Sequence, residues 1–210
     1  MLTITTRTNK GKKHVIRVPE SWEEVTVEMF IRIVKEWDGE DWIKLFSILT
    51  KQDYDGIFNS KDGNLEGKLY RVIEFVLVKF DFEALKPPSF IMFNSRQVEI
   101  PKNIGRLSIG QTIQARKSLE GIEDIREGIS IVTAIYLQPL IDKSKYDHLR
   151  AIEVEQEVLQ MSIVHVFPVG FFLLKKLNVY GNKRMPVWRQ VKQIIVQEGL
   201  KLLKLLRLID

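Results

Sequence analysis

Apolar residues recur every three to four positions along most of this chain, and that spacing predicts a largely helical protein. The stripe is clearest after Thr26, where Val27, Phe30 and Val34 share one helical face. Helices are expected over 26–37, 41–49, 65–80, 108–119, 122–138, 147–161, 171–177 and 187–209. Helix-capping residues precede several of them, since Thr26, Ser108 and Asp147 each stand where a helix pattern begins.

Two pairs of stretches instead have the strand-like pattern of alternating and β-branched residues, and each pair predicts a small β-hairpin. The first joins 2–7 to 14–18 around Gly11, and the second joins 90–93 to 97–100 around 94–96. Pro139 is expected to stop one helix, and Pro168 with Gly170 to make a turn between two buried helices. The expected fold class is therefore mainly α with two small hairpins, that is, α+β.

The stretch after each hairpin is repeated at an offset of 82 residues. In each copy a proline (Pro19, Pro101) ends a strand, and a large apolar residue and then a capping hydroxyl (Thr26, Ser108) follow. A second match, Ser47-Ile48-Leu49-Thr50 with Ser130-Ile131-Val132-Thr133, has an offset of 83. We therefore predict an internal duplication, with a first hairpin–helix unit over 1–86, a second over 87–178, and a basic amphipathic C-terminal helix over 179–210.

This C-terminal segment contains the candidate interaction residues. Its apolar seam recurs at roughly seven-residue intervals and comprises Trp188, Val191, Ile195, Leu202, Leu205 and Ile209. The sequence from Lys175 to Arg207 contains nine basic residues and one acidic residue, a net charge of +8, whereas the remainder of the chain has a net charge of −3. The seam could pack on the chain's own body, on a neighbouring subunit, or on DNA or a membrane surface. The last two are the least favoured.

Catalytic chemistry is not expected. The 210 residues include no cysteine, no glycine-rich phosphate loop and no nucleophile turn, and the three histidines lack metal-ligand spacing. We therefore expect no enzyme activity, no cofactor and no metal. Glu153, Glu155 and Glu157 are interpreted as a solvated helix face, and Trp22 and Trp42 as core residues. The uncharged run from Val158 to Leu174 is interpreted as buried helices, not a membrane span.

The phrase from Val18 to Thr26, followed by a helix and then Ser47 to Thr50, resembles small proteins encoded in the structural-gene blocks of tailed bacteriophages, notably those of Bacteroidetes hosts. The resemblance covers mainly residues 15–50 and supplies no site residues. It implies a non-enzymatic virion component, made in the host cytoplasm, that forms a multi-copy ring or collar near the head–tail junction. Its partners would be copies of itself and neighbouring phage structural proteins.

Two other functions stay open. One is a tail-assembly chaperone that is absent from the mature virion. The other, less favoured, is a nucleic-acid or membrane-surface binder that works through the basic C-terminal segment.

Overall fold

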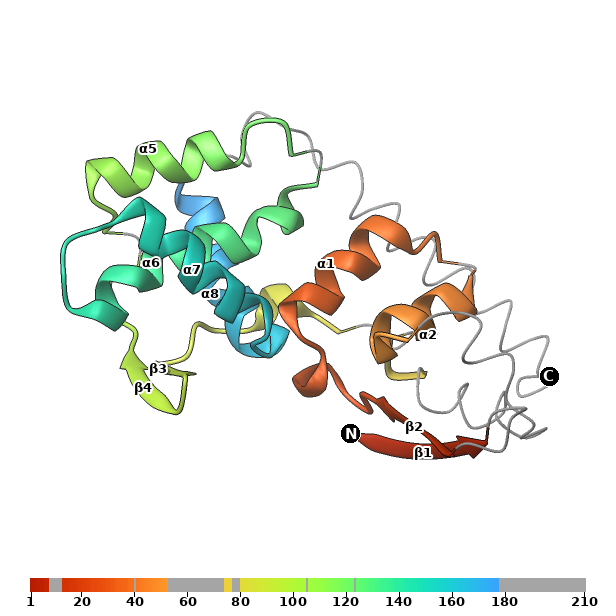
Figure 1. Cartoon of the computed structure of the whole chain (residues 1–210). Coiled ribbons are helices and arrows are strands. Elements are labelled where there is room, and N and C mark those ends of the chain that lie inside the picture. The colour runs from red at the N-terminus through yellow and green to blue at the C-terminus, as the bar shows by residue number, and fades with distance from the viewer. Residues whose placement is uncertain are drawn as a thin grey trace. The chain divides into compact units, whose positions relative to one another are not determined.

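The computed structural model describes residues 1–7, 13–39, 41–52, 74–76, 80–104, 106–122 and 124–177 (Figure 1). These residues form two compact units. The first combines residues 1–25 with the described residues between 35 and 80, and the second combines 26–34 with those from 81 onward. The predicted boundaries at residues 86 and 178 stay predictions.

The first unit pairs a hairpin with a helix. Strands β1 (Leu2–Arg7) and β2 (Lys13–Val18) are antiparallel and place Ile4 opposite Ile16, both of them buried. The helix α2 (Trp42–Thr50) packs against β2 and buries an apolar face on it. Asp41 caps this helix by accepting hydrogen bonds from the amides of Ile43 and Lys44, at 3.1 and 2.9 Å. The predicted hairpin and helix are both confirmed.

The tryptophans of this unit differ in burial. Trp22 lies in a short 3₁₀ helix, η1 (Trp22–Glu24), and is buried as predicted, with its ring edge-on to Phe75 at 5.5 Å between centroids. Trp42 is only half-buried, so its predicted core position is wrong. Trp42 is the first residue of α2, and its ring contacts that of the half-buried Trp37 at 5.9 Å between centroids.

The second unit is a helical body centred on α6 (Ile129–Asp142), which is buried from Ser130 through Gln138 apart from Ile131. It packs against α5 (Ile109–Ser118), α7 (His148–Leu159) and α8 (Ile163–Lys176). The second hairpin, β3 (Phe90–Phe93) with β4 (Arg96–Glu99), turns at Asn94 and Ser95 and contacts α6 through β4. Two 3₁₀ segments complete it, η2 (Phe82–Ala84) and η3 (Ile125–Gly128). The mainly helical α+β class is thereby confirmed.

Most of α1 (Val27–Glu36) also belongs to the second unit, through Val34. The amide of Val27 donates a hydrogen bond to the carbonyl of Met161 at 2.9 Å, just before α8 begins. Farther along α1, the ring of Phe30 meets Phe82 and Phe167, at 5.3 and 5.8 Å between centroids. One backbone bond and an aromatic cluster thus attach α1 to α8.

Pro139 lies inside α6, so the prediction that it stops the helix is wrong. A proline has no amide hydrogen, which deprives the carbonyl four residues earlier of its helical partner. That carbonyl belongs to Ile135, and it accepts a hydrogen bond from Gln111 Nε2 of α5 at 2.7 Å. The helix continues because a neighbouring side chain satisfies the group that the proline leaves open. The same helix begins at Ile129 and not Ile122, since η3 occupies the residues before it.

Pro168 and Gly170 likewise lie within one continuous helix, α8, and the predicted turn between two helices is wrong. Both residues are buried. A tight crossing with α6 surrounds Gly170, since a Cβ built there would lie 2.7 Å from Thr133 Oγ1 and 2.8 Å from Ile129 Cγ2. The glycine that suggested a turn instead lets two helices approach closely.

In both copies of the repeated sequence a β-hairpin precedes two α-helices, in the order β1, β2, α1, α2 and β3, β4, α5, α6. Pro19 and Pro101 follow β2 and β4 closely, and Trp22 and Ile104 are both buried. The helices α1 and α5 have ten residues each and begin at the predicted offset. Superposition of the two whole copies stays a prediction. The copies also differ. The 3₁₀ helix η1 precedes α1, whereas the described residues between β4 and α5 form none. The first hairpin and most of α1 lie in different units, whereas β3, β4 and α5 share one.

Both predicted caps are formed. Thr26 Oγ1 accepts a hydrogen bond from the amide of Met29 at 3.2 Å, and Ser108 Oγ accepts one from the amide of Gln111 at 3.2 Å. At Ser108 the bond is reciprocated, since Gln111 Oε1 accepts from the amide of Ser108 at 2.9 Å, which completes a capping box.

We expect Thr26→Ala and Ser108→Ala each to lower the free energy of unfolding by about 0.5 to 2 kcal/mol, because each leaves a helix amide without its acceptor. Chemical denaturation followed by circular dichroism measures the loss. Ser89→Ala, at an exposed position outside any helix, is the control. Equal stability of all three variants would contradict the capping roles.

Candidate interaction surface

The seam proposed from sequence, Trp188, Val191, Ile195, Leu202, Leu205 and Ile209, lies outside the described residues. Its packing stays a prediction. The part of the chain that the structure describes carries other exposed apolar side chains.

Such side chains concentrate in the second unit. Among the described residues, the large hydrophobic side chains exposed in the first unit are Met1 and Val15. Those exposed in the second unit are Phe90, Met92, Ile109, Ile113, Leu149 and Ile152. Phe90 and Met92 alternate with buried residues on β3, as expected for a hairpin with one face outward. The other four come from α5 and α7.

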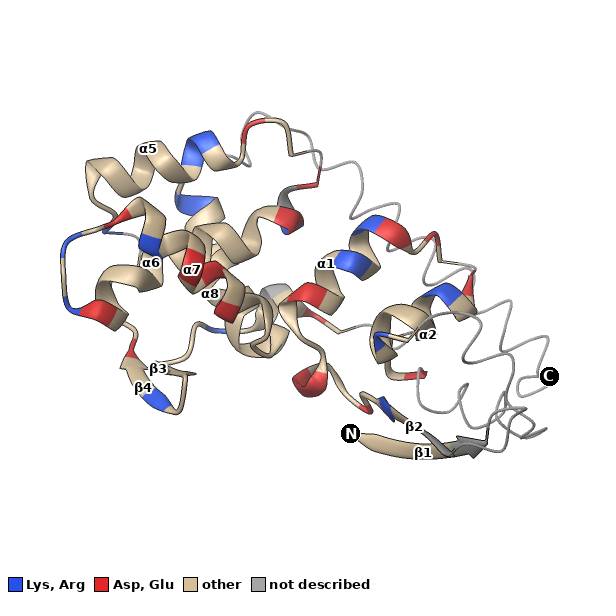
Figure 2. Ribbon diagram, viewed as in Figure 1, with Lys and Arg blue, Asp and Glu red and all other residues tan. Residues whose placement is uncertain are grey.

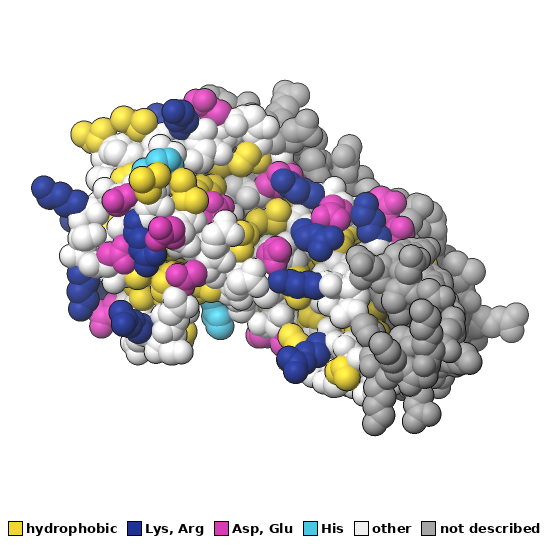
Figure 3. Space-filling model, in the orientation of Figure 1, with side chains coloured by type: hydrophobic (Ala, Val, Ile, Leu, Met, Phe, Trp, Pro, Cys, Tyr) yellow, Lys and Arg dark blue, Asp and Glu magenta, His cyan; other side chains and the backbone are white. Residues whose placement is uncertain are grey.

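We define the α5–α7 surface as Ile109 and Ile113 of α5 with Leu149 and Ile152 of α7. Their exposed fractions are 81%, 62%, 73% and 42%, in that order. The start of α5 lies beside the segment that leads into α7, because a Cβ built on Gly110 would be 3.8 Å from Tyr146 Cδ1. Figure 3 shows hydrophobic side chains on α5 and on α7 on the same face. Isolated exposed apolar residues are ordinary, but four of them on two helices whose starts lie close together make this a candidate contact surface.

Ile109 and Ile113 point outward, although apolar residues four positions apart on a helix ordinarily share its buried face. The buried residues of α5 are instead Gln111 and Ala115. Gln111 is held inward because its amide serves both the capping box and the open carbonyl of Ile135. A helix that buries a glutamine and exposes two isoleucines departs from simple amphipathicity. The sequence alone does not show this departure, because it does not show that Gln111 points inward.

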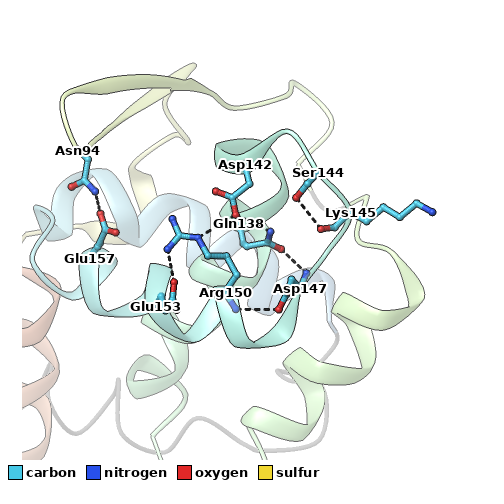
Figure 4. Close-up of polar contacts among 9 residues, drawn as sticks. All are labelled: Asn94, Gln138, Asp142, Ser144, Lys145, Asp147, Arg150, Glu153 and Glu157. Carbon is cyan, nitrogen blue, oxygen red and sulfur yellow. Dashed lines mark hydrogen bonds and ion pairs between the residues drawn. The ribbon is translucent and has the colours of Figure 1, made fainter.

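A polar network holds α7 against the end of α6 (Figure 4). Gln138 Oε1 accepts a hydrogen bond from the amide of Asp147 at 2.8 Å, and Gln138 Nε2 donates to Asp142 at 3.1 Å. Arg150 contacts Asp142 at 3.3 Å and Glu153 at 2.6 Å. Leu149 and Ile152 therefore project from a helix whose first two turns are tied in place. A surface on such a helix is preorganised for binding.

The three α7 glutamates do not form a uniformly solvated face, and this corrects the interpretation from sequence. Glu155 is half-buried and accepts a hydrogen bond from Ser130 Oγ of α6 at 2.7 Å. Glu157 accepts one from Asn94 Nδ2 at the tip of the second hairpin. Glu153 remains at the surface, with 67% of its side chain exposed. The three carboxylates point to three different partners, as helical spacing requires.

Burial raises the pKa of Glu155 above its ordinary value, and the hydrogen bond from Ser130 opposes that rise only in part. Between about 4.3, the pKa of an unfolded glutamate, and the raised value, the folded chain binds more protons than the unfolded chain. The free energy of unfolding therefore falls as the pH rises through that interval.

We expect Glu155→Gln to remove this fall, because glutamine is neutral at every pH and can accept the same bond from Ser130. Its melting temperature at pH 7 should equal or exceed that of the unsubstituted chain. Melting temperatures measured from pH 4 to pH 8 test this, with Glu153→Gln as the exposed control that keeps the fall. A Glu155→Gln chain that loses stability at pH 7 would contradict the burial argument.

Within the described ranges, no group of three or more histidine, aspartate or glutamate side chains could hold a metal ion. His148 and His165 are both exposed. In the same ranges no helix is long and apolar enough to cross a membrane.

No protein-family model, curated protein or solved structure matches this chain. Two features of the chain bear on its function: the α5–α7 surface and the resemblance of residues 15–50 to phage structural-block proteins.

Proposed function

We propose that this chain is a non-enzymatic assembly protein that binds protein partners through the α5–α7 surface. The observation that carries the proposal is the exposure of Ile109 and Leu149 on helices that are capped and tied to the core. Ordered apolar side chains left in water cost free energy that a partner surface recovers. Binding surfaces of this kind use preformed helix faces with small numbers of apolar anchors.

The assembly that fits best is a tailed-phage virion component, present as a multi-copy ring or collar near the head–tail junction. The resemblance of the segments 18–26 and 47–50 to phage structural-block proteins supports this assignment. The repeated hairpin–helix order supports it further, since repeated units suit a scaffold that presents similar surfaces more than once. The partners in this proposal are copies of the chain and adjacent virion proteins.

The test is quantitative mass spectrometry of purified virions of a phage that encodes the chain. The proposal expects the chain in multiple copies per particle, at a fixed ratio to the portal or tail proteins. Absence from finished particles, combined with a loss of tails when the gene is disrupted, would establish the tail-assembly chaperone instead. Absence from particles with normal tails would exclude both assignments.

A further inference from the structure

We propose that residues 187–209 of one copy dock on the α5–α7 surface of a second copy, in a head-to-tail arrangement. This inference rests on the proposed function, in which the chain assembles with copies of itself. It assigns the two halves of one interface: an apolar seam expected from sequence, and an apolar surface of exposed side chains on the described helices α5 and α7.

The apolar spacing of the two halves is complementary. Ile109 and Ile113 are four residues apart on α5, and Leu149 and Ile152 are three apart on α7. Each pair therefore forms a short stripe along its helix, and the surface consists of two neighbouring stripes. An amphipathic helix binds such a site by laying its own apolar stripe against both. The sequence from 187 to 209 predicts that stripe, with Trp188 as the aromatic anchor typical of interface centres.

The charges of the two halves are opposite along α7. Residues 187–209 contain five basic side chains and one acidic side chain. On the other half, α7 carries three glutamates and one arginine. Glu155 and Glu157 are hydrogen-bonded to Ser130 and Asn94, whereas Glu153, which follows Ile152 directly and contacts Arg150, keeps 67% of its side chain exposed. Figure 2 shows these acidic positions along α7. Arg116 and Lys117 in the last turn of α5 repel the same basic segment, so they favour an orientation in which its basic side chains point toward α7.

A head-to-tail interface also has the symmetry that a ring requires. Each copy would contribute its segment 187–209 to one neighbour and its α5–α7 surface to the other, so every contact leaves one half free for the next copy. If two α5–α7 surfaces paired with each other, assembly would close at a dimer and the acidic α7 helices would meet. If residues 187–209 instead packed on the α5–α7 surface of the same copy, neither would be available to a second copy.

The experiment uses the full chain and two double variants. The surface variant is Ile109→Glu with Leu149→Glu, at side chains that are mostly in water, so folding is preserved. The tail variant is Ile195→Glu with Leu202→Glu. Phe90→Glu, an exposed apolar position on β3, is the matched control. Sedimentation velocity measures association over a concentration series, and circular dichroism verifies folding.

The unsubstituted chain and the control are expected to form species larger than a dimer, and each double variant alone is expected to be monomeric. Mixing the two variants should then restore one interface and produce a one-to-one heterodimer that grows no further. That outcome is specific to a head-to-tail contact. Glu153→Lys should also shift the unsubstituted chain toward monomer, whereas Arg116→Glu should shift it toward larger species.

Four outcomes would overturn the proposal: a surface variant that still assembles, a tail variant that forms dimers, a variant mixture that stays monomeric, or an unsubstituted chain that is monomeric at all concentrations. These results are independent of the virion test. A chain found in virions that is monomeric in solution contradicts the docking alone, and a chain that assembles head to tail but is missing from virions contradicts the virion assignment alone.

Discussion

Phe167→Ala is expected to lower the free energy of unfolding of the second unit by about 3 to 5 kcal/mol. Phe167 is completely buried. Its ring lies 4.9 Å from that of Phe82 and 5.3 Å from that of Phe171, between centroids, and meets Phe30 of α1 edge-on. Alanine would remove the ring that three separate segments share.

The large size follows from the position of the cluster. Removing a buried aromatic ring loses its transfer free energy and leaves a cavity that rigid helices close only in part. The ring also holds α1 in place through Phe30. Another contact of α1 is the hydrogen bond from the amide of Val27 to the carbonyl of Met161, just before α8. Aromatic pairs add about 0.5 to 1.5 kcal/mol each beyond the area they bury.

Urea denaturation followed by circular dichroism measures this loss. Phe90→Ala is the control, because Phe90 lies on the outer face of β3 with much of its ring in water. The control should change the free energy of unfolding by less than about 1 kcal/mol. A Phe167→Ala chain as stable as the control would show that the cluster does not support the helical body.

The second large effect is expected at Gly170, where alanine should cost about 1 to 3 kcal/mol despite its higher helix propensity. A Cβ at this position would lie 2.7 Å from Thr133 Oγ1, 2.8 Å from Ile129 Cγ2 and 3.2 Å from the carbonyl oxygen of Ile129. The last of these atoms is backbone, so it can move only if α6 and α8 separate. Overpacking at this crossing outweighs the intrinsic gain of about 0.5 to 1 kcal/mol.

Gly110→Ala is the matched control, since Gly110 is also helical but exposed. A Cβ there would meet Tyr146 Cδ1 at 3.8 Å, an ordinary contact distance. The control is expected to be stabilised by up to about 1 kcal/mol, so thermal melts should shift in opposite directions for the two substitutions. A shift in the same direction for both would refute the close crossing.

Local sequence was sufficient to predict where most of the described elements begin. A cap depends on a few consecutive residues, and Thr26, Ser108 and Asp147 all act at the expected positions. The same holds for both hairpins, which join strands close in sequence. The repeat offset correctly placed α5 because it copies this local signal from α1.

The faces of the helices were not predictable in this way. Ile109 and Ile113 are apolar yet exposed, because the inward position on α5 belongs to Gln111. That position depends on a carbonyl 24 residues away in α6, left open by Pro139. The α5–α7 surface is therefore a product of tertiary packing, and hydrophobic spacing alone predicts the opposite orientation. Glu155 behaves similarly, since only the approach of Ser130 reveals that it turns inward.

The sequence by itself determined the helical character, the two hairpins, the repeated order of elements and most of the capped helix starts, because each depends on contacts within a few residues. Only the tertiary structure decided that Pro139 and Pro168 lie inside helices and that Gly170 lets α6 and α8 cross closely. It also decided that α1 joins the unit of α8 and which apolar side chains remain in water. Those outcomes depend on groups brought together from distant parts of the chain, whose hydrogen bonds and packing override local preference.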